Sequence, residues 1–167
     1  MDYGMMLSKL AGGMLTTVAI FGLTLLFSMP LGMAVAFGRM SKNKLIRNIT
    51  KIYISIMRGT PLMLQVMVVY FGRYYLLGLQ LTSSYRFIAV IIGFVLNYAA
   101  YFAEIYRGGI ESMPVGQYEA AALLGYTKGQ TFLRIILPQV IKRIIPSVTN
   151  EVITLVKDTS LARMIAA

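Results

Sequence analysis

The amino-acid sequence predicts an all-α integral membrane protein, a helical bundle of about four transmembrane helices in one domain covering residues 1–167. Of its residues 57% are hydrophobic and only 13% are charged, about half the charged fraction of a typical soluble protein. The first apolar run extends from Gly12 to Gly38 without a charge, which is more than the roughly 20 residues that span a bilayer. A net charge of +10 is also found in nucleic-acid-binding proteins, but here the basic residues lie between apolar runs, as the positive-inside rule predicts. We therefore expect a lipid bilayer as surroundings and no nucleic-acid partner.

The first two predicted spans have recognisable packing and interface signals. The span from Gly12 to Gly38 carries small residues near one face, which permits close helix packing: Gly13, Thr17, Thr24, Ser28 and Gly32. The second span runs from about Thr60 to Leu81 and is interrupted by Arg73, which can reach the membrane interface near the outer end. An aromatic belt is predicted at that end, formed by Tyr70, Tyr74, Tyr75 and Tyr85.

The third and fourth predicted spans carry charges at or within their ends. The third starts near Arg86 and has an uncharged run from Phe87 to Ala103. It should continue as a helix out of the membrane, because Arg107 and Glu111 form an i,i+4 pair. The fourth, roughly Pro138 to Ser160, is only marginally apolar, since it is interrupted by Glu151, Lys157 and Asp158.

The basic residues predict the orientation of the chain. The segment 39–58 is expected to be a cytoplasmic loop, because it contains no acid and six basic residues: Arg39, Lys42, Lys44, Arg47, Lys51 and Arg58. Together with the segment 104–143 it holds eleven Lys and Arg residues, whereas the remaining segments hold five. We therefore expect the N-terminus outside and successive spans to end inside, outside, inside and outside.

Residues 104–138 form the longest well-charged insert, and their pattern predicts two short helices around a bend. Pro114 suits the first turn of a helix, where its missing N–H is not needed. Residues 120–124 are good helix formers, and Gly125 falls where a left-handed residue would end the helix.

The second short helix has a start signal and an expected end. Thr127 and Gln130 form a T-x-x-Q capping box. Pro138 disfavours the helical conformation at Leu137, so a break or kink is expected there.

The insert resembles the EAA loop of permease subunits of ABC importers. The shared pattern is Glu119-Ala120-Ala121, three residues, Gly125, nine residues, Ile135, one residue, then Leu137-Pro138. In that family the short helix is a cytoplasmic coupling helix that docks into an ATPase subunit. An ordinary helical hairpin would explain the helices but not the fixed Gly and Leu-Pro positions. The resemblance implies ATPase coupling through Gly116, Glu119, Ala120, Ala121, Gly125, Leu137 and Pro138.

Other segments resemble permeases of the polar amino-acid importer family, of the histidine, glutamine and arginine type. They are Arg58-Gly59-Thr60-Pro61-Leu62 with Gln65, Ala103-Glu104 with Arg107-Gly108-Gly109-Ile110, Pro114 with Gly116-Gln117, and Lys157-Asp158-Thr159-Ser160-Leu161. The resemblance implies a multi-pass permease subunit in the cytoplasmic (inner) membrane, which moves a polar amino acid by alternating access. Such permeases usually have a fifth membrane helix after the Lys157–Leu161 region, and we expect this sequence to lack it.

The same resemblance implies the partners. They are ATP-binding cassette subunits that bind ATP and Mg, a second permease subunit that forms a homo- or heterodimer, and an extracytoplasmic solute-binding protein. We expect no cofactor and no enzymatic activity in this chain, because it contains no G-x-x-x-x-G-K-[ST] loop.

Polar stripes on two predicted spans indicate a hydrophilic path. In the fourth span Ser147, Asn150, Glu151, Thr154 and Asp158 share one helix face. An ionised carboxylate at mid-membrane costs about 3 kcal/mol or more, so this stripe must face protein or a water-filled cavity. In the third span the aligned residues are Asn97, Tyr101, Glu104 and Gly108. Interhelical hydrogen bonding explains Asn97 equally well, whereas a cavity is favoured for Glu151. The predicted substrate path is formed by Gln65, Asn97, Tyr101, Asn150 and Glu151.

Two other classes of membrane protein are alternatives to the transporter subunit, and a basic structural membrane protein is a further one. An ion-driven secondary carrier or channel for small solutes would also contain polar stripes, but it has no reason to keep the spacing of the coupling loop. An intramembrane enzyme needs a catalytic set, and this sequence has no His, no Cys and no evident Ser/Lys or paired-acid arrangement. We therefore expect neither catalytic residues nor a metal site.

Overall fold

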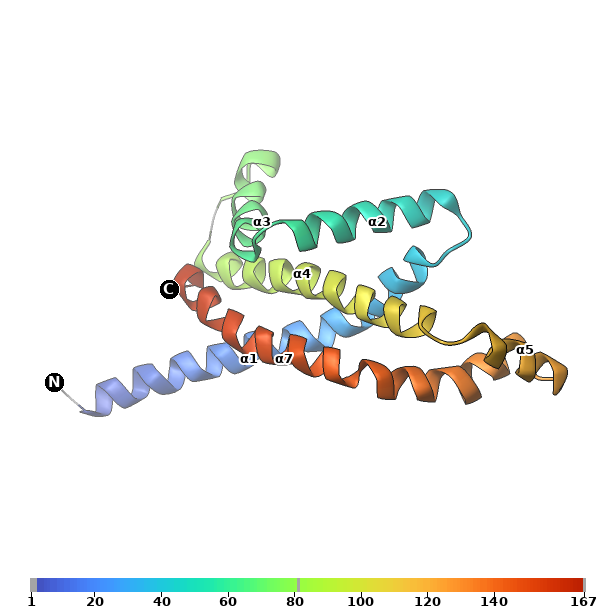
Figure 1. The fold of residues 1–167 in the computed structure, drawn as a ribbon. Coiled ribbons are helices and arrows are strands. Elements are labelled where there is room, and N and C mark those ends of the chain that lie inside the picture. Colours follow the sequence, from blue (N-terminus) through green and yellow to red (C-terminus); the bar gives the residue numbers. More distant parts are fainter. Residues whose placement is uncertain (1–2, 81, 167) are drawn as a thin grey trace.

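The computed structural model describes residues 3–80 and 82–166, with side chains described up to Ala162, and this part of the chain is helical without strands. The all-α prediction is thus confirmed (Figure 1). The helices are α1 (Tyr3–Arg39), α2 (Lys44–Gly59), α3 (Leu62–Leu77), α4 (Ser83–Glu111), α5 (Val115–Leu123), α6 (Lys128–Gln130), the π-helix η1 (Thr131–Ile136) and α7 (Leu137–Ala166).

Helix α4 is the centre of the bundle, because it packs against α1, α2, α3 and α7. Figure 1 shows α1, α4 and α7 running lengthwise, with α3 across one end and α5 at the end opposite the N-terminus. The main core lies around α4, where Phe94, Tyr98 and Phe102 are almost completely buried.

The α1–α4 contact is built on small residues. Every fourth residue of α1 from Ile20 is buried, namely Ile20, Thr24, Ser28, Gly32 and Ala36. A Cβ atom on Gly32 would lie 2.8 Å from Phe102 Cβ and 3.0 Å from the Ala99 carbonyl oxygen, so only glycine allows this approach. The predicted stripe is confirmed for Thr24, Ser28 and Gly32, whereas Gly13 and Thr17 are only half-buried.

The prediction of a loop over residues 39–58 is wrong, because residues 44–59 form helix α2. Asn43 caps its start by accepting a 2.9 Å hydrogen bond from the Leu45 N–H. Four of the basic residues recur at helical spacing and gather on one face of α2: Lys44, Arg47, Lys51 and Arg58. Helix α2 packs on α4, and Ile54, at the edge of this charged face, is buried.

The second predicted span is shorter than expected. Helix α3 begins at Leu62 and ends at Leu77, where Gly78 adopts a left-handed conformation with φ of 63°. The predicted end, Leu81, lies outside the described residues. With 16 residues, α3 is about 24 Å long, less than the roughly 30 Å of the hydrocarbon core. It joins α2 at an angle of 111°, so the two form one bent apolar unit.

The number of straight spans is therefore lower than the predicted four. By length and composition, α1 and α4 can each cross a membrane, and the bent α2–α3 pair is a third candidate among the described residues. The fourth helix of the bundle, α7, has 30 residues and packs against α4 and α1. Its charged residues keep its composition below that of a typical span, as the marginal hydrophobicity of residues 138–160 indicated.

Candidate functional site

Helix α5 projects from the end of the bundle on a turn fixed by its flanking residues. Pro114 stands just before the helix, with φ of −60°, rather than in its first turn as predicted. Gly125 has φ of 79°, so the left-handed stop predicted there is confirmed. The Tyr126 N–H donates a 3.0 Å hydrogen bond to the Ala121 carbonyl and closes the bend.

The second half of the loop starts with the predicted capping box. The Gln130 N–H donates to Thr127 Oγ1 over 3.2 Å, and the Thr127 N–H donates to Gln130 Oε1 over 3.0 Å. Two backbone N–H groups at the start of the helix, those of Thr127 and Gln130, thereby gain partners. The capping box therefore fixes the backbone conformation with which the chain enters η1 and α7.

Of the break or kink predicted at Leu137, the break is not found, because the chain passes from η1 into α7 without interruption. Instead, residues 131–136 are π-helical, and the Leu137 N–H bonds to the Phe132 carbonyl five residues earlier. This wider π-helical hydrogen-bond register lies just before Pro138, which has no backbone N–H to donate. The helix therefore changes its pitch at this point instead of ending.

The surface of α5 is largely free. Glu119 and Ala120 are exposed, Ala121 is buried, and Leu123 at the tip is 90% exposed. Gln117 and Gln139 exchange two side-chain hydrogen bonds of 3.0 and 2.7 Å, which tie α5 to α7. The loop is thus a projecting apolar tip with one acid, held to a long helix behind it.

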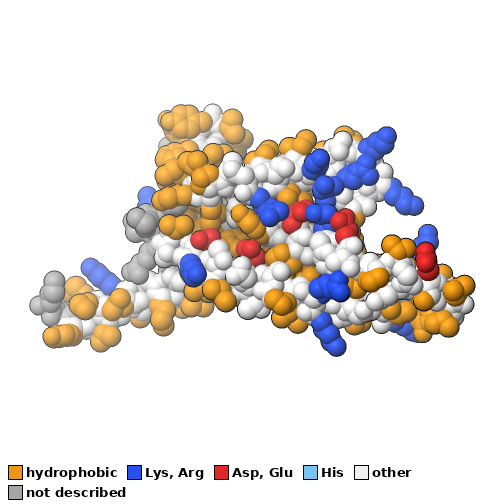
Figure 2. Space-filling model, in the orientation of Figure 1, with side chains coloured by type: hydrophobic (Ala, Val, Ile, Leu, Met, Phe, Trp, Pro, Cys, Tyr) orange, Lys and Arg blue, Asp and Glu red, His pale blue; other side chains and the backbone are white. Residues whose placement is uncertain are grey.

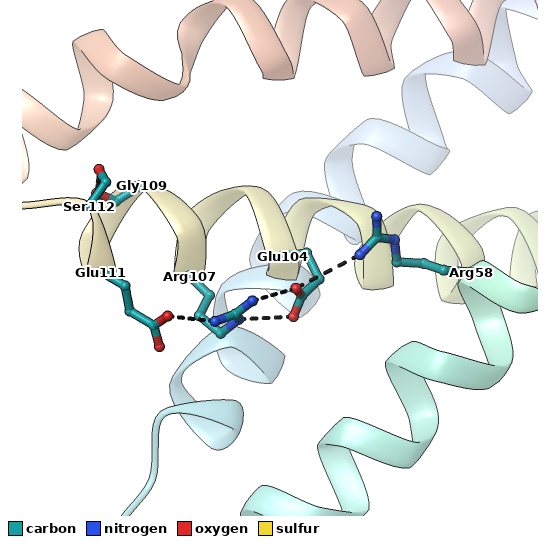
Figure 3. Close-up of polar contacts among 6 residues, drawn as sticks. All are labelled: Arg58, Glu104, Arg107, Gly109, Glu111 and Ser112. Atoms are coloured by element: carbon teal, nitrogen blue, oxygen red, sulfur yellow. Dashed lines mark hydrogen bonds and ion pairs between the residues drawn. The ribbon is translucent and has the colours of Figure 1, made fainter.

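A chain of ion pairs lies on the end of α4 nearest to α5 (Figure 3). Arg107 makes a two-pronged contact with Glu104, with Nε to Oε1 at 3.0 Å and Nη2 to Oε2 at 2.7 Å. Its Nη1 also donates to Glu111 Oε2 over 2.5 Å, which confirms the predicted i,i+4 pair. Arg58 of α2 approaches Glu104 Oε2 from the other side, at 3.8 Å.

The last turn of α4 is also fastened to α7. Arg143 Nη1 donates to the carbonyl and the hydroxyl oxygen of Ser112, both over 2.9 Å. The Ser112 hydroxyl in turn donates to the Gly109 carbonyl over 2.7 Å. A Cβ atom at Gly109 would collide with Ile144 Cγ2, so the two helices meet closely here. A displacement of α5 would therefore act on both α4 and α7.

Two of the predicted path residues, Gln65 and Asn97, hydrogen-bond to each other. Asn97 Nδ2 donates to Gln65 Oε1 and to the Met57 carbonyl, both over 3.0 Å. Gln65 Nε2 donates to the Met57 carbonyl over 2.9 Å and to Thr60 Oγ1 over 2.7 Å. Both amides are buried, so together they hold the α2–α3 bend against α4.

The other three predicted path residues lie apart from this pair. Tyr101 is half-buried on α4, and its ring lies 5.3 Å from the guanidinium carbon of Arg58. On α7, Asn150 is exposed and Glu151 is half-buried. In the described part of the chain, neither the Asn150 nor the Glu151 side chain hydrogen-bonds to Gln65 or Asn97. Figure 2 shows acidic side chains along the middle of the molecule in the orientation of Figure 1, with Lys and Arg side chains beside them.

Comparison with known proteins identifies the family. Residues 28–167 match the family described as the inner membrane component of binding-protein-dependent transport systems. A putative glutamine transport system permease protein of Rickettsia bellii is 40% identical over 152 residues, covering 91% of this chain and 68% of the relative. The L-cystine transport system permease protein TcyB of Bacillus subtilis is 39% identical over 156 residues, covering 93% of this chain and 65% of the relative. The chain belongs to the binding-protein-dependent permease family.

Solved structures agree with this assignment. An amino acid ABC transporter crystallised with histidines superposes with a TM-score of 0.83 at 30% identity, covering all of this chain and 78% of that chain. The MetNI methionine ABC transporter has a TM-score of 0.63 at 20% identity and covers 94% of this chain and 74% of that chain, so it supports the fold alone. This chain is therefore a membrane subunit of the ABC importer type.

Some contacts of the permease were not anticipated from the sequence. The i,i+3 spacing of Glu104 and Arg107 could have indicated their pairing, because such residues are neighbours on a helix. The approach of Arg58 to Glu104 joins two helices distant in sequence, and no local pattern predicts it. The 2.6 Å hydrogen bond from the Tyr98 hydroxyl to Asp158 Oδ2 was missed for the same reason.

Proposed function

We propose that this permease carries a polar amino acid across the cytoplasmic membrane by alternating access, driven by ATP hydrolysis in a separate subunit. The names of its relatives support the solute class, since they include glutamine and cystine permeases. The observation that carries the coupling role is the projecting helix α5, whose exposed Glu119 and Ala120 stand beside the turn at Gly125.

The contacts behind α5 suit it to transmit a push. The ATPase subunit, which would hold ATP and Mg, docks on α5 through Gly116, Glu119 and Ala120. The Gln117–Gln139 bonds and the continuous helix through Leu137 and Pro138 pass the displacement to α7. The Arg143–Ser112 bonds pass it to α4, so that these two helices rock together.

The remaining parts of the assembly follow from the same role. A second permease subunit completes the membrane part, and an extracytoplasmic solute-binding protein delivers the amino acid. The N-terminus lies outside and α5 lies in the cytoplasm, because the basic residues concentrate in the segments 39–58 and 104–143.

The solute path follows the polar face between α4 and α7. Glu151 is half-buried there and is suited to attract the ammonium group of an amino acid, with Tyr101 and Asn150 beside the path. Gln65 and Asn97 make their hydrogen bonds within the chain, so in the state described they position the α2–α3 bend next to the path.

Charge reversal at Glu119 tests the docking role. The permease is co-expressed with its partner ATPase subunit, and co-purification and solute-stimulated ATP hydrolysis are measured. Glu119→Lys should lower both, because it leaves a repelling charge at a buried contact. Glu119→Gln should have a smaller effect. Lys9→Glu, an equal reversal on exposed α1 at the opposite end of the bundle, is the control and should leave both unchanged. Unchanged stimulation in Glu119→Lys would contradict the assignment.

A further inference from the structure

Helix α2 presents an apolar stripe that the rest of the described chain leaves exposed. Its residues are Leu45, Ile49, Ile52 and Ile56, which follow one another at intervals of four, three and four and so share one face of the helix. Each of these side chains is between 52% and 67% exposed. A row of large aliphatic side chains on the surface marks contact with an apolar partner or with a membrane.

A basic stripe runs along α2 beside the apolar one. It consists of Lys44, Arg47 and Lys51, which also recur at helical spacing. The ion pairs of the described chain all lie in the cluster of Figure 3, so none of these three cations takes part in one. The whole segment 39–58 contains no acid that could offset them.

The remaining side of α2 holds the helix to the bundle. The Tyr53 hydroxyl donates a hydrogen bond to the Leu96 carbonyl of α4. At the end of α1, a Cβ atom on Gly38 would lie 2.8 Å from Thr50 Cγ2, so the two helices meet closely there. These contacts fix the rotation of α2 about its axis, and the apolar and basic stripes are therefore presented side by side.

The basic stripe lies at the level where the membrane spans end. A polar cleft of about 360 Å³ brings Lys51 and Ser55 of α2 next to Arg39, the last residue of α1, and Glu104, the first charged residue after the apolar run of α4. Charges that flank apolar runs mark the headgroup level of a bilayer. The cleft therefore opens among lipid headgroups, and the apolar stripe beside it meets acyl chains.

Two cations of this cleft are uncompensated. Arg58 and Glu104 also line it, but both belong to the cluster of Figure 3, in which two arginines are balanced by two glutamates. Arg39 and Lys51 take part in no ion pair among the described residues. With the exposed Ser55 hydroxyl they supply hydrogen-bond donors and positive charge. A phosphate group carries negative charge and accepts hydrogen bonds, so it suits this set of residues.

We propose that α2 binds an anionic phospholipid of the adjoining leaflet. The headgroup phosphate lies in the cleft against Arg39, Lys51 and Ser55, and the acyl chains lie along the apolar stripe. A second protein chain would need acids and an aliphatic surface in matching register, whereas one anionic phospholipid supplies both. This inference goes beyond the proposed function, because it concerns the membrane and not the transported solute.

Fluorescence quenching by brominated lipids shows which lipid lies on the apolar stripe. The chain contains no tryptophan, so Ile52→Trp introduces a single reporter. The full chain is reconstituted in phosphatidylcholine vesicles that contain a small fraction of brominated phosphatidylglycerol or, in matched samples, the same fraction of brominated phosphatidylcholine. Val18→Trp is the control reporter, because Val18 is equally exposed but lies on α1 in a run without charge. Circular dichroism checks that each variant is helical, and Ile49→Trp is a second reporter on the apolar stripe.

The reporter at Ile52 should be quenched about fivefold more strongly by the anionic lipid than by phosphatidylcholine, since each basic residue near a membrane surface favours an anionic lipid by about this factor. The reporter at Val18 should be quenched equally by both lipids. Adding Arg39→Gln and Lys51→Gln to Ile52→Trp should bring the ratio close to one, and raised salt should lower it. Lys9→Gln removes an exposed cation of α1 and should leave the ratio unchanged.

Three results would overturn the lipid site. Equal quenching by both lipids at Ile52→Trp would show that the helix does not select an anionic headgroup. No quenching by either lipid would show that protein, such as a second copy of the chain, covers the apolar stripe. A preference that survives Arg39→Gln with Lys51→Gln would show that the cleft does not hold the headgroup. Inorganic phosphate at constant ionic strength should leave the ratio unchanged, and its loss would mean that the cleft takes free phosphate instead of lipid.

Discussion

The Tyr98 hydroxyl on α4 donates a 2.6 Å hydrogen bond to the Asp158 carboxylate on α7, and both residues lie in the bundle rather than at its surface loops. Tyr98 is 2% exposed, so few water molecules can replace this partner. A hydrogen bond to a charged group typically contributes about 1.5–3 kcal/mol. This contact therefore fixes the position of α7 relative to α4.

Removing either partner of this bond should destabilise the bundle. We expect Tyr98→Phe and Asp158→Asn each to lower the free energy of unfolding by about 1–3 kcal/mol, and the double variant to lose much less than the sum. Thermal or denaturant unfolding in detergent measures all three. Additive losses would mean that the two groups do not interact in the folded protein.

Gly32 should be intolerant of any side chain. Its Cβ would lie 2.8 Å from Phe102 Cβ, so Gly32→Val forces α1 away from α4 and should cost about 1–3 kcal/mol. Gly22→Ala in the same helix is the control, because nothing lies within 4 Å of its Cβ position. The control should be neutral or slightly stabilising. Equal unfolding temperatures for the two variants would contradict the close α1–α4 packing.

The bend at Gly125 should depend on glycine. With φ of 79°, a β-branched residue is strained there, so Gly125→Val should cost about 1–2 kcal/mol locally. The expected sign is faster amide hydrogen exchange over residues 115–131, with the rest of the bundle unchanged. Gly129→Ala lies in the same loop with open space around it and should exchange like the wild type. Unaltered exchange in Gly125→Val would show that the bend does not need a left-handed residue.

How well the sequence predicts this fold depends on the range of the interactions involved. The stop at Gly125 and the Thr127–Gln130 capping box are local, and both were predicted. The charges of α2 interrupt the apolar run and so predict a loop, although their spacing places them on one helix face. The local preference of proline predicts a break or kink at Leu137, and it does not predict the π-helical turn that precedes it.

The candidate site was predictable in its residues and not in its contacts. Gln65 and Asn97 were both singled out, but only the folding of α3 against α4 reveals that they bind each other. The position of Arg58 between Tyr101 and Glu104 likewise depends on how α2 packs, which a single sequence does not encode in any local pattern. The structure thus shows which of the predicted polar residues contact one another.

The orientation proposed from loop charge predicts which side of the membrane each segment faces. The chain has no native cysteine, so single cysteines can be introduced without interference. Cysteines at Lys44 and Gln117 should react with an impermeant thiol reagent only from the cytoplasmic side, and one at Ser83 only from outside. External labelling at Lys44 would show that the whole bundle has the orientation opposite to the one proposed.

The central claim is that this chain is the membrane part of an ATP-driven amino-acid importer, and reconstituted transport tests it most directly. The permease is assembled in vesicles with its ATPase on the side of α5 and with its solute-binding protein on the other side. We expect uptake of a polar amino acid that requires ATP and Mg on the α5 side and is lost in Glu119→Lys. Uptake that proceeds without ATP, and that follows an imposed ion gradient, would contradict it and indicate a secondary carrier.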